Sequence, residues 1–222
     1  MKKKQLSKHL GERQPSGCVF VEDTPAWVEW IVPEKFNNWE LFRIVVFFVF
    51  HSPCVGASSA SGCPSAMGKP ITEYGWSEKW GNYRTKGTLN NTLRNACSNF
   101  AFLFSATGNN DMLQACQKAD LCIGFPHALD IERVAISNSY KNQFLSLFRH
   151  IRNAFSHGRI NMNEMTDGDL MFILEDIGRK KPEGIPASAR ILLRKSTLLK
   201  WIDIIEAGPQ ASNEEVIFNG KG

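Results

Sequence analysis

The residues best suited to chemistry lie in the stretch SLFRHIRNAFSHGRI, in the second half of the chain. At about 100° per residue, a helix through this stretch places Arg149, Asn153 and His157 on one stripe. Arg152 and Ser156 lie beside that stripe. Guanidinium groups bind phosphate oxygens in pairs, and imidazole exchanges protons near neutral pH. The stretch therefore indicates a site that binds a phosphodiester and cleaves it by general acid–base catalysis.

The charge pattern around this stretch favours an anionic ligand. From residue 133 to residue 159 there is no Asp or Glu, and the five basic residues are Arg133, Lys141, Arg149, Arg152 and Arg159. A structural arginine usually pairs with a carboxylate, and the local sequence offers none. The net charge of +4 is mild, so the placement of the charge matters more than its total. We expect a phosphate group to be the partner of these arginines.

The elements that must position these residues are expected to be helices. Helical periods and capping residues predict a first helix from residue 25 and further helices over 34–51, 88–107, 111–122, 129–136 and 140–157. Ser137 or Asn138 is the expected N-cap of the last of these, and Gly158 is the expected stop. In that helix the buried stripe is expected to be formed by Tyr140, Phe144, Leu147, Phe148, Ile151 and Phe155.

The pattern changes after Gly158. LMFILEDI and ARILLRK predict two strands, 170–177 and 189–195, that form a β-hairpin. Ser196 is the expected cap of a final helix that ends at Gly208 and Pro209. The predicted organisation is a polar basic arm over 1–23 and a single domain over 24–222. That domain comprises a helical bundle over about 24–158 with a Ser/Gly-rich loop over about 51–70, then the hairpin and helix over about 160–208.

Several classes of protein are disfavoured. The six cysteines form no CxxC pair, and the spacing His51-x2-Cys54-x8-Cys63 lacks a second pair of ligands, so we expect no metal site. Free thiols are typical of a reducing cytoplasm. The apolar run IVVFFVF is far too short to span a bilayer, and no apolar signal segment follows the basic N-terminus. The expected location is the cytoplasm, without a membrane partner.

The motif Arg152-Asn153-x3-His157, followed by Gly158, resembles the R-(polar)-x3-H motif of the HEPN superfamily. RNase branches of that superfamily carry an R-x4–6-H signature near the end of a bundle helix. The tail ARILLRKSTLLKWIDII is similar to the strand-and-helix ending of a plasmid-borne bacterial branch of HEPN nucleases. The resemblance runs from about residue 88 to Gly208. It implies a mainly α fold of the α+β class, with a HEPN-like helical bundle, a C-terminal β-hairpin and a final helix.

The resemblance also implies an activity, namely metal-independent endoribonuclease cleavage of RNA at a composite site in a homodimer, with no cofactor. His157 would be the acid/base for attack of the ribose 2′-OH on the adjacent phosphate. Arg152 would hold that phosphate and its developing charge. Asn153 would orient the histidine or the RNA.

Residues outside the motif are expected to give only supporting contacts to RNA. They are Arg149, His150, Ser156 and Arg159. His150 is expected at the surface rather than in a catalytic role. The basic segment GRKKPEG, together with Arg190, Arg194 and Lys195, is a second expected backbone-binding surface.

Two alternatives stay open beside the nuclease. Arg152 and His157 could simply hold the carbonyl groups at the helix end. Some HEPN proteins are catalytically silent modules that bind RNA or a protein partner. For the nuclease we expect a role as a toxin or antiviral defence effector, and hence a cognate inhibitor, antitoxin or activation step.

Overall fold

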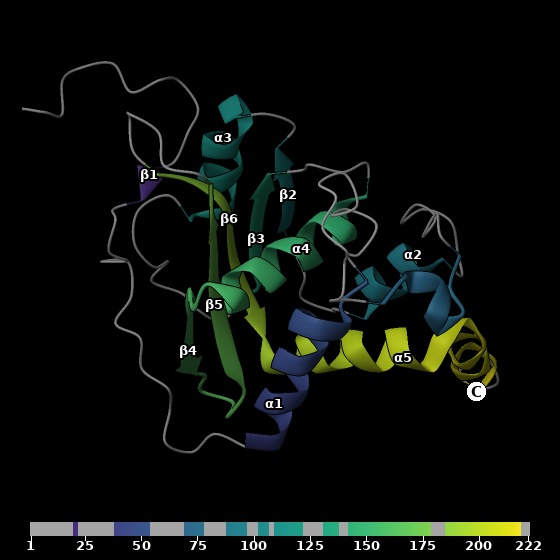
Figure 1. Cartoon of the computed structure of the whole chain (residues 1–222). Coiled ribbons are helices and arrows are strands. Elements are labelled where there is room, and N and C mark those ends of the chain that lie inside the picture. The colour runs from purple at the N-terminus through teal and green to yellow at the C-terminus, as the bar shows by residue number, and fades with distance from the viewer. Residues whose placement is uncertain are drawn as a thin grey trace, which may run out of the picture.

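A mixed β-sheet with helices on both of its faces organises the described part of the chain (Figure 1). The computed structural model describes residues 20–21, 38–53, 69–77, 88–96, 102–106, 109–121, 131–137, 142–178 and 185–218. Its strands are β1 (Phe20–Val21), β2 (Phe102–Ala106), β3 (Arg133–Ser137), β4 (Ile160–Glu164), β5 (Leu170–Ile177) and β6 (Ile185–Arg194).

The strand order is β2-β3-β6-β5-β4, and β1 pairs with the beginning of β6. The pair β2/β3 is parallel, and all other pairs are antiparallel. The helix between β2 and β3 makes this parallel pair a β–α–β unit, because parallel neighbours need a crossover connection. The hairpin of β5 and β6 lies at the centre of the sheet, flanked by β3 and β4.

The helices are α1 (Asn38–Val46), which continues as the π-helical segment η1 (Phe47–His51), the short 3-10 helix η4 (Ile71–Tyr74), α2 (Leu89–Asn95), α3 (Asn109–Ala119), α4 (Gln143–Ser156) and α5 (Lys195–Phe218). Helix α3 packs on β2 and β3 at one face of the sheet. Helices α1, α4 and α5 gather at the other face, where α4 crosses β5, β3 and β6 (Figure 1).

The alternation of side chains along β5 divides the core in two. Phe172 and Leu174 belong to the cluster formed with α4 and α5, whereas Met171 and Ile173 belong to the cluster formed with α3. All four side chains are fully buried. Because neighbouring residues of a strand face opposite sides, a strand covered on both faces carries apolar side chains toward both, as β5 does from Leu170 to Leu174.

Helix α4 buries one stripe, as its sequence predicts. Phe144, Leu147, Phe148, Ile151 and Ala154 are all at most 2% exposed. The rings of Phe144 and Phe148 lie 5.6 Å and 5.8 Å from the ring of Trp201 on α5. The predicted stripe is thus confirmed for Phe144, Leu147, Phe148 and Ile151. Phe155 is only half-buried, whereas its neighbour Ala154 is fully buried. Tyr140 lies outside the described residues. Asn142, and not the expected Ser137 or Asn138, caps the helix by accepting hydrogen bonds from the next turn.

The end of α4 follows the expected glycine pattern. Gly158 has φ of +65°. Its N–H donates to the oxygen of Phe155 (3.2 Å), and the N–H of Arg159 donates to the oxygen of Ala154 (2.9 Å). These two bonds form a Schellman motif, which ends a helix while satisfying its last carbonyl groups. The predicted stop after His157 is confirmed.

The predicted mainly α fold with a helical bundle over 24–158 is wrong. The expected helix over 88–107 stops at Asn95, and β2 occupies residues 102–106. The expected helix over 129–136 is replaced by β3. Val134, Ala135 and Ile136 of β3 are completely buried, so its apolar run shows no period of two that would distinguish a strand from a helix.

Other parts of the predicted organisation fare better. The predicted hairpin is confirmed as β5 and β6, and the predicted helices over 34–51 and 111–122 correspond to α1 with η1 and to α3. The predicted final helix is present as α5, but it begins at Lys195, before the expected cap Ser196, and it continues beyond a kink at Gly208 to Phe218. The short strand β4 was not predicted. The first helix from residue 25, most of the basic arm, most of the Ser/Gly-rich loop and residues 179–184 lie outside the described ranges. None of the helices in the described ranges is long and apolar enough to cross a lipid bilayer.

Candidate functional site

The polar residues of α4 lie along one edge of the helix, which ends at the surface of the molecule. We call Arg149, Arg152, Asn153, Ser156 and His157 the α4 polar edge. Ser156 and His157 are exposed, and the other three are half-buried. Among the described residues, the side chains of Arg152 and His157 have no ion-pair or hydrogen-bond partner. Within the described part of the chain, both side chains are therefore uncommitted.

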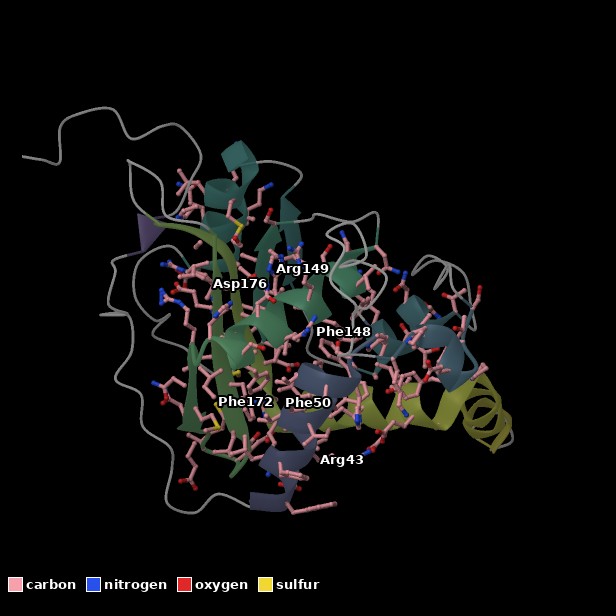
Figure 2. All side chains as sticks on the ribbon, in the orientation of Figure 1. Arg43, Phe50, Phe148, Arg149, Phe172 and Asp176 are labelled. Atoms are coloured by element: carbon pink, nitrogen blue, oxygen red, sulfur yellow. The ribbon has the colours of Figure 1, made fainter. Side chains whose placement is uncertain are left out.

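Beneath this edge, a buried carboxylate of β5 binds two residues of α4. Oδ2 of Asp176 lies 2.6 Å from Nδ1 of His150 and accepts a hydrogen bond from Nδ2 of Asn153 at 3.0 Å. Nε2 of His150 lies 2.9 Å from the backbone oxygen of Ser137, at the end of β3. Figure 2 shows Asp176 on β5 close to the helix that carries Arg149. One carboxylate thus joins α4, β5 and β3.

The neighbouring carboxylate, that of Glu175, lies on the opposite face of the sheet. It lies 3.1 Å from Nε of Arg190 and 3.7 Å from Nη2 of Arg159. Arg190 also donates to the backbone oxygen of Leu121 at 2.7 Å. Burial raises the pKa of the Glu175 carboxyl, although the two arginines act in the opposite direction. This network ties the chain just after the helix end to the hairpin and to the end of α3.

These contacts correct the interpretation of the acid-free stretch. Arg159 faces Glu175, and Arg133 forms an ion pair with Asp120 at 3.0 Å. The absence of acids along the local sequence therefore does not mean an absence of acids in space. That interpretation depends on five basic residues. Among those whose side chains the structure describes, only Arg152 has no partner within the described part of the chain.

The structure places three of the expected RNA contacts inside the molecule. His150 is 3% exposed, Arg159 is 7% exposed and Arg190 of the second expected surface is 4% exposed, and all three side chains are engaged with buried carboxylates. The prediction of a surface position for His150 is wrong, and none of these three side chains can reach a ligand in this arrangement. Arg149 and Ser156 remain on the accessible edge. Asn153 is tied to Asp176, so its amide supports the helix and is not directed only at a ligand.

The arrangement can supply one proton-transferring group and one fixed positive charge. His157 ends the helix, and Arg152 lies just over one turn earlier. A guanidinium group can hold two phosphate oxygens while the imidazole accepts or donates a proton. Within the described ranges, no group of three His, Cys, Asp or Glu side chains could hold a metal ion.

Comparisons of the chain with protein-family models, with curated proteins and with solved structures found no match. The functional reading of the site therefore depends on its own geometry and chemistry.

Asp176 and Glu175 are the residues that sequence reasoning missed at this site. A signal for them was present, since LEDI places two adjacent acids inside an apolar strand. Buried carboxylates must be paired, because an unpaired buried charge is very costly. The two acids therefore indicated cationic or donor partners on both faces of the strand, although not which ones.

Proposed function

We propose that the α4 polar edge binds and cleaves RNA without a metal ion, which makes the protein an endoribonuclease. The observation that carries this proposal is the pairing of an exposed His157 with a half-buried Arg152 on a helix end, without a described partner for either side chain. Side chains that merely cap a helix would instead bind its last carbonyl groups, and here the backbone N–H groups of Gly158 and Arg159 already do so.

In the proposed reaction, the ribose 2′-OH attacks the adjacent phosphorus. The bond from phosphorus to O2′ forms, and the bond to the 5′ oxygen of the next nucleotide breaks. A base takes the proton of the 2′-OH, and an acid gives a proton to the leaving oxygen. The products are a 2′,3′-cyclic phosphate and a 5′-OH end. Arg152 holds the phosphate and the negative charge that develops on it, and His157 transfers one of the two protons.

The test is incubation of the purified protein with single-stranded RNA in the presence of EDTA. We expect cleavage by the natural protein and a loss of about 100-fold or more in rate for His157→Ala and for Arg152→Ala. The matched controls are His51→Ala, on η1, and Arg43→Ala, whose guanidinium is already paired with Asp203. A requirement for a divalent metal, or full activity of His157→Ala, would contradict the proposal.

A second candidate function is RNA binding without cleavage. One observation favours it: each chain has a single exposed imidazole at this edge, whereas the reaction is served best by two proton-transferring groups. In that case RNA would bind with an affinity that falls steeply with salt, and no product would form. Arg152→Ala would weaken binding, while His157→Ala would leave it unchanged.

A further inference from the structure

Both ring nitrogens of His150 face oxygens that accept hydrogen bonds. Nδ1 lies 2.6 Å from Oδ2 of Asp176, and Nε2 lies 2.9 Å from the backbone oxygen of Ser137. A carbonyl oxygen has no proton to give, so Nε2 must be the donor. An ionised carboxylate can only accept hydrogen bonds, so beside an ionised Asp176 the donor is Nδ1. A ring that carries both protons therefore satisfies both contacts at once.

The Asp176 carboxylate also reaches the end of α4 through Asn153. Its Oδ2 accepts from the Asn153 amide at 3.0 Å, and the backbone oxygen of Asn153 accepts from the N–H of His157 at 2.9 Å. His150 and Asn153 are three residues apart and so lie on one face of the helix. Asp176 itself is 4% exposed and stands where the register of β5 and β6 shifts. A shift of this kind re-aims the side chains beside it.

We infer that Asp176 is a positioning residue for the α4 polar edge, and that its buried ion pair with a doubly protonated His150 holds the last turns of α4 against β5 and β3. The carboxylate does not touch a ligand. It acts through Asn153 and His150, which fix where Arg152 and His157 stand. The consequence for cleavage rests on the proposed function, since small misplacements of reacting groups cost large factors in rate.

The protonation of His150 can be measured on the unaltered protein by 15N NMR of its histidine rings. We expect two N–H groups on the buried ring of His150, and the loss of one of them in Asp176→Asn, which keeps the shape of the side chain but not its charge. A His150 ring with a single proton in the unaltered protein would overturn the inference. This measurement shows whether the ion pair between His150 and Asp176 exists, even if no variant of Asp176 folds.

The positioning role is tested with Asp176→Asn and with Asn153→Ala, which removes only the amide. For the folded variants we expect shifted backbone amide signals from Arg152 to Gly158. We also expect a loss of at least about tenfold in kcat, with KM for RNA changed less than about twofold. The control is Asp120→Asn, a 73% exposed partner of Arg133. Unchanged amide signals together with an unchanged kcat in a folded variant would overturn the inference. An unaltered protein that shows the predicted signals and cleaves no RNA would refute the proposed function and leave the positioning role standing.

Discussion

Single residues in this protein gain their roles from partners that are distant in the sequence. Glu175 and Asp176 are adjacent in the chain. Glu175 pairs with two arginines on one face of the sheet, whereas Asp176 binds α4 on the opposite face. The sequence placed Arg152 and His157 at the end of one amphipathic helix, where α4 has them, because such a helix can be drawn from local spacing. It misplaced His150 and Arg159, because the carboxylates that hold them inside the molecule come from a strand formed later in the chain.

Glu132 provides a prediction for the pH dependence of stability. This side chain is 2% exposed, and its Oε1 accepts from the backbone N–H of Arg194 at 2.8 Å. Burial raises the pKa of its carboxyl, against hydrogen bonds from Arg194 and Thr197. A raised pKa means that the folded state holds the proton more tightly than the unfolded state does. The stability that this group contributes is therefore present below its unfolded pKa of about 4.3 and is lost as the pH rises through the folded pKa.

The variant Glu132→Gln keeps the accepting oxygen and has no proton to lose. We expect its free energy of unfolding, relative to that of the natural protein, to increase as the pH rises from about 4 to about 7. Urea unfolding at several pH values measures this difference. The contribution of Glu175 to the pH dependence is the same in both proteins, so it cancels in the difference. A difference that is constant or that decreases with pH would show that Glu132 does not titrate in this way.

At the scale of the elements, the sequence predicted the helices and strands whose residue pattern is visible within a short stretch of the chain. Helix α4 has a clear apolar stripe, and the β5/β6 hairpin with α5 has strand-like and helix-like stretches separated by turn residues. Strands β2 and β3 escaped prediction because they pair with each other in parallel across α3, an arrangement that no short window of sequence reveals. The cap of α4 at Asn142 was missed for a simpler reason, since several residues in SNSYKN can cap a helix.

The kink in α5 depends on Gly208, and a substitution at this glycine can test that dependence. Gly208 has φ of +76° and ψ of −178°, a region open almost only to glycine, and a Cβ there would lie 2.9 Å from the backbone oxygen of Tyr74. We expect Gly208→Ala to lower the free energy of unfolding by at least about 2 kcal/mol. Gly168→Ala is the matched control, because φ there is +82° and a Cβ would meet nothing within 4 Å. It should cost about 1 kcal/mol. Equal losses in the two variants by chemical denaturation would contradict the role assigned to the contact with Tyr74.

At the scale of the whole molecule, the question is how the single exposed imidazole of the α4 polar edge could serve the proposed reaction, which has two proton transfers. A two-fold axis beside the α4 polar edge would supply a second His157 without new sequence. Pairing two edges that each carry Arg149 and Arg152 brings like charges together. The proposed homodimer should therefore tighten when salt or RNA screens that repulsion.

Mixing of inactive subunits tests this shared site. We expect a mixture of Arg152→Ala and His157→Ala proteins to regain part of the RNA cleavage that each lacks alone, because one of the two sites in a heterodimer can combine intact residues from both chains. Light scattering at low and high salt should show the dimer under the assay conditions. A strict monomer at micromolar concentration that cleaves RNA at the full rate would exclude the shared site. The reaction would then take place at the α4 polar edge of a single chain.

The most direct test of the central claim is to identify the ends of the products made from two matched oligonucleotides in EDTA. One is an RNA strand, and the other is the same strand with every ribose 2′-OH methylated. If Arg152 and His157 promote attack by the 2′-OH, the RNA yields ends that carry a 2′,3′-cyclic phosphate, and the methylated strand stays intact while still binding. Cleavage of the methylated strand, or products from RNA that end in a 3′-OH, would contradict the account.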